Sequence, residues 1–332
     1  MPLTLMSTTA NRELEGNADR LLSLVQGYQF ERVIDPFCGS GSFTFEAMRR
    51  NMAKQYIVCD AYPPIIDMHK TVQVSPDDLK KAYLGLCNTG LGFFTQHPIA
   101  CVEKLENEKD PCKRAALWIF LSNRLLNNRP LFAGEKIVSQ LNLHSALSQL
   151  EIFKRIDQTN KLFSQQKVTF MNMRASDFFM NLQHLTSKDF VILDPPYPGC
   201  DDPKNSIFYR PEDDKKLYLI LMDILNLLNQ KGVRYIFNYG IFWGYGKQDK
   251  NYFIDAEALN LHELVLVSEN HADPQFKLLI ERIYVSKNIE LSMKNLPQGF
   301  VPFSIIEKFD YEHAKECILE HLKKEAPLRS RL

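Results

Sequence analysis

The sequence predicts an α/β fold: a mostly parallel sheet with an antiparallel edge, interrupted by a helical insertion. A short apolar strand near the start of the chain, residues 32–35, runs into a glycine turn and then a helix. Strands and helices then alternate around a long segment of helical pattern, residues 77–165. Two apolar runs follow one another late in the chain, and such consecutive strands favour an antiparallel edge on an otherwise parallel sheet.

The turn after the first strand suits a ligand that carries a nucleoside. It contains Gly39 and Gly41, which let the backbone bend sharply and let a ligand approach where a Cβ atom would intrude. A helix is expected over residues 43–50, and its unpaired N–H groups would lie beside that ligand. The next expected strand, residues 55–60, ends in Asp60, where α/β nucleotide folds place a carboxylate on ribose hydroxyls. The turn lacks the third glycine of a dinucleotide site and the chain has no P-loop, so the ligand is better read as an adenosyl group.

The helical segment, residues 77–165, has apolar residues at helical spacing in three stretches. It also carries lysines and arginines that are suited to phosphate contact, with asparagines and arginines that could read base edges. An element that recognises nucleic acid would lie here. For any single lysine, an ordinary solvated helix face is an equally good interpretation.

The apolar strand at residues 189–193 is followed by Asp194, Pro195, Pro196 and Tyr197. The carboxylate and a carbonyl of the rigid proline pair can accept both hydrogens of an exocyclic amine, while the tyrosine ring can stack on the attached heterocycle. These groups favour methylation of a nucleobase nitrogen. The alternative is a plain turn, in which the prolines end the strand and the tyrosine covers the core.

The remaining pattern predicts a helix, three strands and a final helix. In order, these elements are expected at residues 216–229, 233–237, 264–267, 278–285 and 311–324. The last two strands of this series supply the antiparallel edge.

Composition indicates in which cellular compartment the protein works and which kinds of binding site it is expected to have. The 332 residues, 45% of them hydrophobic, are enough for a catalytic unit plus an insertion. Seven scattered cysteines form no Cys-x-x-Cys pair and the histidines form no cluster at zinc spacing, so no metal site is expected. The chain has no signal peptide and no apolar run of membrane length, which favours a cytoplasmic protein without membrane association. Its 40 basic and 40 acidic residues balance, which argues against duplex binding through a broad basic patch.

Five short stretches together resemble a known family. They are Asp35-Pro36-Phe37-Cys38-Gly39-Ser40-Gly41-Ser42-Phe43, Val58-Cys59-Asp60, Phe120-Leu121-Ser122-Asn123-Arg124-Leu125-Leu126-Asn127-Asn128, Ala175-Ser176-Asp177-Phe178 and Leu193-Asp194-Pro195-Pro196-Tyr197. In this order and spacing the chain resembles the Dam-type S-adenosylmethionine-dependent DNA adenine-N6 methyltransferases. The resemblance implies a Rossmann-like methyltransferase sheet, mostly parallel with an antiparallel edge, plus a helical insertion domain.

The resemblance also implies a cofactor, S-adenosylmethionine, and residues that hold it. These are Phe37, Gly39 and Gly41 along the methionine and adenosine pocket, Asp60 on the ribose, and Asp177 with Phe178 on the cofactor adenine. The target would be an adenine of double-stranded DNA, flipped out of the helix and held by the Asp-Pro-Pro-Tyr residues, 194–197. The segment that matches the family's DNA-contacting helix and loop contributes Arg124, Asn128 and Arg129.

The implied organisation has three parts. A catalytic domain would comprise residues 1–76 and 165–289, with a target-recognition insertion at residues 77–164 and a C-terminal extension at residues 290–332.

One stretch departs from the family. The family opens with a Lys-Trp-x-Gly-Gly-Lys-like segment, and residues 12–21 here keep Gly16 and Arg20 but lack the second glycine and the lysines. This departure leaves open a relative that binds nucleic acid or cofactor without catalysing. An RNA methyltransferase is the other alternative, and the long helical insertion favours DNA by resemblance. A chromosomal mark, a restriction-modification system and a phage origin all fit the sequence.

Overall fold

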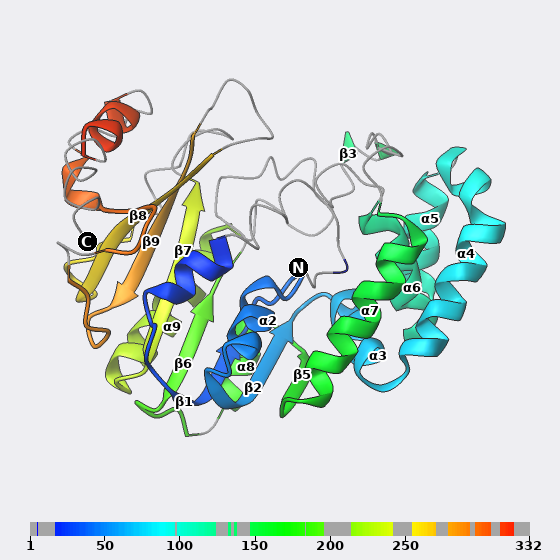
Figure 1. Ribbon diagram of the computed structural model, residues 1–332, viewed down its shortest axis with the longest axis horizontal. Helices are drawn as coiled ribbons and strands as arrows, with labels where there is room; N and C mark the ends of the chain where they lie inside the picture. Colours follow the sequence, from blue (N-terminus) through cyan, green and yellow to red (C-terminus); the bar gives the residue numbers. More distant parts are fainter. Residues whose placement is uncertain are drawn as a thin grey trace.

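The computed structural model describes residues 5, 17–96, 98–123, 132–133, 136–137, 147–182, 184–195, 214–241, 254–269, 278–292, 296–306 and 313–321. Within these residues a single large sheet lies at the centre, helices cover both of its faces, and a group of helices lies beyond one edge (Figure 1). None of the described helices is long and apolar enough to cross a membrane.

The large sheet has eight strands in the order β10-β8-β9-β7-β6-β1-β2-β5. Their bounds are Phe30–Asp35 (β1), Ala53–Asp60 (β2), Val168–Asn172 (β5), Asp189–Leu193 (β6), Arg234–Ile241 (β7), Leu261–Glu269 (β8), Leu278–Ser286 (β9) and Phe300–Pro302 (β10). The five strands from β7 to β5 are parallel, whereas β9, β8 and β10 add antiparallel pairs at the other edge. This topology confirms the expected Rossmann-like α/β sheet with an antiparallel edge.

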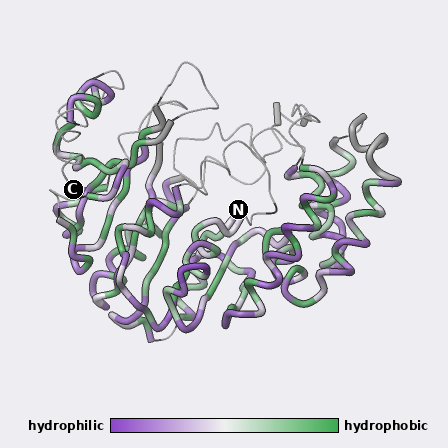
Figure 2. Tube along the Cα trace, in the orientation of Figure 1, coloured by the Kyte–Doolittle hydropathy of each residue, from purple (hydrophilic) through white to green (hydrophobic). Residues whose placement is uncertain are grey.

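The central strands are buried on both faces, as short apolar runs in parallel sheets usually are. Successive side chains point to opposite faces, so Val33 and Tyr56 join one hydrophobic cluster while Ile34 and Ile57 join another. Figure 2 shows the central strands as mainly hydrophobic and the surrounding helices as mixed.

Helices complete the two outer layers. A helix at residues 17–23 and α2 (Ser42–Arg49) cover the face of Val33, and α8 (Ala175–Asn181) and α9 (Asp214–Gln230) cover the face of Ile34. On the face of the sheet that carries Val33, Phe30 of β1 stacks on Phe190 of β6 at a ring-centroid distance of 4.8 Å.

Beyond β5, five helices lie side by side (Figure 1). They are α3 (Pro63–Val74), α4 (Pro76–Gln96), α5 (Pro98–Asn107), α6 (Pro111–Ser122) and α7 (Gln149–Ser164). Four of them begin at a proline, which has no N–H to lose in the first turn and whose fixed φ angle suits a helix start. Before α6, the Asp110 carboxylate also accepts hydrogen bonds from the N–H groups of Cys112 and Lys113.

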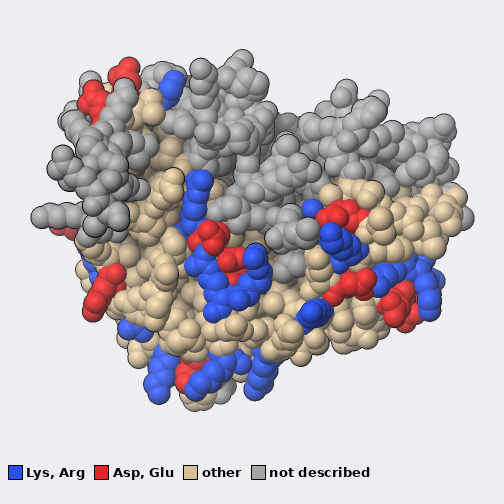
Figure 3. All heavy atoms as spheres, viewed as in Figure 1, with Lys and Arg blue, Asp and Glu red and all other residues tan. Residues whose placement is uncertain are grey.

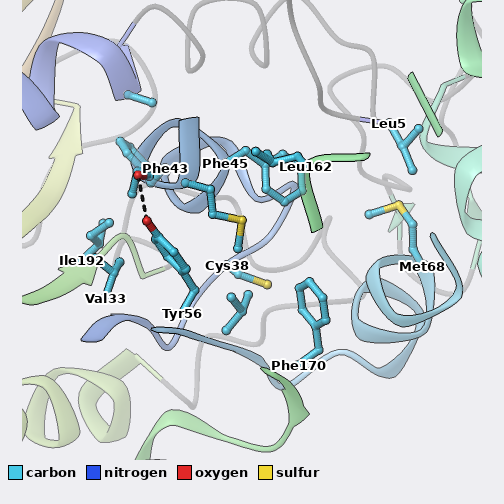
Figure 4. Close-up of a cluster of buried hydrophobic side chains, with 14 of the residues drawn as sticks. Leu5, Val33, Cys38, Phe43, Phe45, Tyr56, Met68, Leu162, Phe170 and Ile192 are labelled. Carbon is cyan, nitrogen blue, oxygen red and sulfur yellow. Dashed lines mark hydrogen bonds between the residues drawn. The ribbon is translucent and has the colours of Figure 1, made fainter. Parts of the chain in front are cut away.

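The helical group shares its core with the sheet. Leu79, Trp118 and Ile152 of this group belong to the same cluster as Tyr56 of β2. Figure 4 shows part of this cluster, including Tyr56, whose hydroxyl donates to the carbonyl oxygen of Ala47 (3.1 Å). The residues on both sides of the expected domain boundaries, near 76 and 164, therefore contribute to one continuous hydrophobic core.

Several elements differ from expectation. The strands β5 and β10 were not anticipated. β5 mixes polar and apolar residues and has one buried position, and β10 has three residues, so neither gives the apolar run that marks β6. The same holds for the small hairpin of β3 (Phe132–Ala133) and β4 (Lys136–Ile137). The final helix is described at residues 313–321, and the rest of the expected range 311–324 lies outside the described residues.

The packing of β6 yields a prediction about stability. Phe190 is fully buried and stacks on Phe30, so we expect Phe190→Ala to lower the free energy of unfolding by about 3–5 kcal/mol. Met180→Ala is the control, since that side chain is 76% exposed and its truncation should cost less than about 0.5 kcal/mol. Urea unfolding measures both variants. Equal losses of unfolding free energy in the two variants would contradict the close packing of Phe190 in the core.

Candidate active site

The turn between β1 and α2 depends on two glycines in the left-handed region. Gly39 has φ 48° and Gly41 has φ 86°, conformations that side chains disfavour. A Cβ atom on Gly41 would lie 2.5 Å from Cζ of Phe45, whereas one on Gly39 would have no atom within 4 Å. Gly41 is therefore required for packing within the protein, while the space beside Gly39 is open to a ligand.

The peptide groups of Gly39 are held on both sides. The Asp60 carboxylate accepts a hydrogen bond from the Gly39 N–H group (3.0 Å), and Nε2 of His69 lies 3.0 Å from the Gly39 carbonyl oxygen. Since the carbonyl can only accept, His69 donates from Nε2. These two hydrogen bonds fix the backbone of the turn at Gly39, where the space beside the backbone is open.

His69 is buried and uncharged. Its ring packs edge-on against Phe45 and stacks on Phe170, both at about 5.5 Å between ring centroids. Burial lowers the pKa of His69 to about 4, and the hydrogen bond to Gly39 opposes this only in part. The Nδ1 atom, buried in this apolar surrounding, has no hydrogen-bond partner among the described residues. His69 was not among the residues expected from the sequence.

Asp60, at the end of β2, also starts the next helix. Its second oxygen accepts a hydrogen bond from the N–H group of Tyr62 (2.8 Å), just before α3. Burial raises the pKa of Asp60, and the N–H groups of Tyr62 and Gly39 partly offset this rise. Because each carboxylate oxygen can accept more than one hydrogen bond, Asp60 keeps capacity for ligand hydroxyls.

Asp35 ends β1 and is almost completely buried. Its carboxylate accepts hydrogen bonds from the Thr44 hydroxyl (2.6 Å) and the Phe37 N–H group (3.3 Å). Burial raises the pKa of Asp35 to about 7, and the negative charges of Asp194 and Asp60 add to the rise. Asp35 thus anchors the glycine turn to α2 from inside the protein.

Asp194 follows β6, on the other side of β1. Its Oδ1 atom accepts a hydrogen bond from the amide nitrogen of Asn238, on β7, at 3.0 Å. Pro195 is buried directly after it. Asp194 itself is only partly buried, so its carboxylate can reach a ligand.

These groups meet at one edge of the sheet. Because β1, β2, β6 and β7 are parallel, their carboxyl ends lie together, and Asp35, Asp60, Asp194 and Asn238 all sit there. The chain order of the strands also reverses between β1 and β6. Ligands of open α/β sheets bind in the crevice at such a reversal.

Three other expected residues lie around this edge. Phe37 is partly buried against the α9 side of the sheet. Asp177 is exposed in the first turn of α8, whereas Phe178 is 1% exposed and packs edge-on against Phe179. The helical period of α8 thus turns Asp177 outward and Phe178 into the core.

Some expected residues fall outside the described residues. These are Pro196 and Tyr197 of the Asp-Pro-Pro-Tyr motif, and the candidate DNA contacts Arg124, Asn128 and Arg129. Their roles stay predictions.

Asn238 is a site residue that the sequence interpretation missed. A signal was present, since it is a polar residue that follows the apolar run of the expected strand at residues 233–237. For His69 no comparable signal exists, because the residue lies on an amphipathic helix, where a buried histidine is usually part of the core.

Comparison with known proteins gives one family. A family model described as D12 class N6 adenine-specific DNA methyltransferase matches residues 18–216. No curated protein matches the sequence. Among solved structures, the chain is similar to HI0767 of Haemophilus influenzae, described as a methylase, with 14% identity and a TM-score of 0.32 over 82% of this chain and 88% of that chain. It is also similar to the rRNA methyltransferase aviRa of Streptomyces viridochromogenes, with 13% identity and a TM-score of 0.35 over 87% of this chain and 91% of that chain.

The glycine turn yields a prediction that separates steric from backbone effects. Gly41 and Gly27 have nearly equal φ angles, 86° and 89°, but only a Cβ atom on Gly41 meets another residue, Phe45. Replacing either by alanine costs about 1–2 kcal/mol for the left-handed backbone. We expect Gly41→Ala to cost a further ~1–3 kcal/mol from overpacking, as measured by urea unfolding. Equal losses for the two variants would contradict the close contact.

The burial of His69 predicts a loss of stability in acid. Its pKa is about 4 in the folded protein against an ordinary value of 6.5, so the unfolded chain binds more protons between these pH values. The stabilisation is fully present above pH 6.5 and is lost as the pH falls towards 4, by roughly 3 kcal/mol. We expect the difference in unfolding free energy between wild type and His69→Phe to shrink accordingly when measured from pH 7 down to pH 4.

Wild type has to be compared with a variant because Asp35 changes the unfolding free energy with pH in the opposite direction to His69. Its pKa is raised to about 7, so its contribution to stability grows as the pH falls and is lost as the pH rises through 7. The contribution is common to wild type and His69→Phe and cancels in their difference. His184→Asn, which removes an exposed histidine, is the control. A difference that stays constant with pH would show that His69 is not held neutral.

Proposed function

The chain belongs to the D12 class N6 adenine-specific DNA methyltransferase family, and we propose that it transfers a methyl group from S-adenosylmethionine to N6 of an adenine in double-stranded DNA. The observation that carries the proposal is the meeting of two groups of residues at the strand reversal. The glycine turn with Asp60 lies on one side of this edge, and Asp194 with Pro195 lies on the other.

The residues of the glycine turn fit the cofactor. The space beside Gly39 is open, so an adenosyl group can approach the backbone there. Asp60 has lone pairs left for the ribose hydroxyls, and the exposed Asp177 carboxylate can accept from the amino group of the cofactor adenine. Phe37 and Gly41 would complete the pocket, with Phe178 supporting it from the core.

The Asp194 side holds the target amine. Asp194 and the carbonyl of Pro195 would accept the two amine hydrogens, which turns the nitrogen lone pair out of ring conjugation and towards the methyl donor. S-adenosylmethionine would supply an electrophilic methyl group when bound. The amine nitrogen would form the new bond to the methyl carbon as the carbon–sulfur bond breaks and sulfur keeps its electrons, and the proton that the nitrogen loses would pass to solvent water. Positioning supplies most of the rate enhancement, and no covalent intermediate with the enzyme is needed.

A base within a duplex cannot reach this edge, so the target adenine would flip out at a cost of a few kcal/mol. Tyr197, with Pro196 beside it, would replace the lost stacking. Arg124, Asn128 and Arg129, which follow α6 in the sequence, would contact the DNA. Where Figure 3 colours this face of the molecule, basic and acidic side chains are interspersed.

The test is methyl transfer from labelled S-adenosylmethionine to unmethylated genomic DNA, with RNA in parallel and with base-resolution mapping of the product. We expect label on adenine N6 of DNA. We expect Asp194→Ala to lower kcat by about 10³-fold, because it removes an acceptor for the amine. We expect cofactor binding measured by calorimetry to stay within about 2-fold, because the bonds that hold the Gly39 turn come from Asp60 and His69.

Asp223→Ala is the control, since Asp223 is exposed on α9. It should keep full activity. Label on RNA alone would contradict the DNA substrate and support an RNA methyltransferase. Cofactor binding without transfer to either nucleic acid would support a binding protein without catalysis.

A further inference from the structure

Asn238 lies directly beside Asp194 across two parallel strands. Leu193 of β6 pairs with Phe237 of β7, so the next residue on each strand is Asp194 and Asn238 respectively. The amide nitrogen of Asn238 donates to Oδ1 of Asp194 over 3.0 Å. Asn238 is 2% exposed, so water does not compete with this bond, and a hydrogen bond to a charged group is strong in such surroundings.

Within the described part of the chain, one of the two polar atoms of the Asn238 side chain has a partner. Its carbonyl oxygen is buried and has no hydrogen-bond partner among the described residues. A buried polar atom left unpaired is costly and calls for an explanation. A leucine of similar size would avoid this cost. The asparagine is therefore best explained by its donor, which faces the carboxylate.

The neighbouring charges make such a donor useful. Asp194 raises the pKa of Asp35 by charge repulsion, and the same repulsion acts on Asp194. A third carboxylate, Asp60, ends the strand on the far side of β1 and also repels Asp35. An N–H donor favours the ionised form of a carboxylate and so opposes this repulsion.

We propose that Asn238 is the positioning residue for Asp194: its amide group holds the carboxylate through Oδ1 and keeps it ionised, so that the carboxylate can accept from the target amine. This inference rests on the proposed function, because it assigns the Asp194 carboxylate to an amine of the substrate. Asn238 acts through Asp194 and does not touch the substrate. Its loss changes the ionisation and orientation of the carboxylate and leaves the glycine turn intact.

The first test follows Asp194 without any substrate. The carboxyl carbons of aspartate are labelled with ¹³C, and the Asp194 signal is identified by its absence in Asp194→Asn. The midpoint of its pH titration is then compared between wild type and Asn238→Leu. We expect the midpoint to lie at higher pH in the variant, because the donor that favours the ionised form is gone. An unchanged midpoint would overturn the proposal.

The second test is kinetic. We expect Asn238→Leu to lower kcat by about 10- to 100-fold, as misplacement of a positioned group does, and to leave KM for S-adenosylmethionine within about 2-fold. The acid limb of its pH–activity profile should move to higher pH together with the titration midpoint. A loss of kcat with an unmoved acid limb would assign Asn238 a structural role only.

A variant of the same shape covers the case in which leucine prevents folding. Asn238→Asp can donate to Asp194 only while the pair shares a proton. We therefore expect the residual activity of this variant to fall as the pH rises and the shared proton is lost. The wild type behaves in the opposite way on its acid limb, where activity rises with pH. A profile of the wild-type form in Asn238→Asp would overturn the proposal.

The matched control is Asn229→Ser. The Asn229 amide, on α9, donates a hydrogen bond to the carbonyl oxygen of Leu259 and accepts one from the hydroxyl of Tyr235, near the opposite end of β7. We expect it to leave the midpoint of Asp194 unchanged. If the wild type transfers no methyl group to DNA, the proposed function fails, and the titration of Asp194 still decides the function of Asn238.

Discussion

The candidate site depends on how the Gly39 backbone is held. The N–H group of Gly39 is bound by Asp60, at the end of a neighbouring strand, and its carbonyl by His69, on the helix that follows. A left-handed glycine with open space beside it would otherwise adopt many conformations. Two bonds from separate elements select one of them. The position of the proposed cofactor site is thus a property of the β1–β2–α3 unit rather than of the turn alone.

A second constraint is electrostatic. Asp35, Asp60 and Asp194 end three parallel strands at the same edge, and their charges disfavour one another. The fold meets this cost with donors: a hydroxyl for Asp35, N–H groups for Asp60 and an amide for Asp194. A cationic ligand such as a sulfonium would find negative charge already concentrated there. Ordered carboxylates that repel one another are characteristic of functional sites, where stability is given up for chemistry.

Features that depend on a short run of neighbouring residues could be predicted from the sequence. The glycine turn, Asp60 and the Asp194 strand are local patterns, and the structure places them at one edge as the α/β class requires. Asn238 and His69 were missed. The signal for Asn238, a polar residue after an apolar run, does not give its partner, which depends on strand register, and the contact of His69 with Gly39 spans 30 residues of the chain. Phe178 shows the opposite case. The resemblance implies a contact of Phe178 with the cofactor adenine, and the sequence alone did not show that the ring is 1% exposed within the core.

The common core of the sheet and the helical group limits how the protein can move. Domains that rotate on each other usually meet through small and rather polar interfaces. Here apolar side chains from α4, α6 and α7 continue the cluster of β2 without a break. A hinge between the two parts would have to open a close-packed interior, which is costly. The sheet and helices α4, α6 and α7 therefore form one packed unit, without a natural place for a hinge between them.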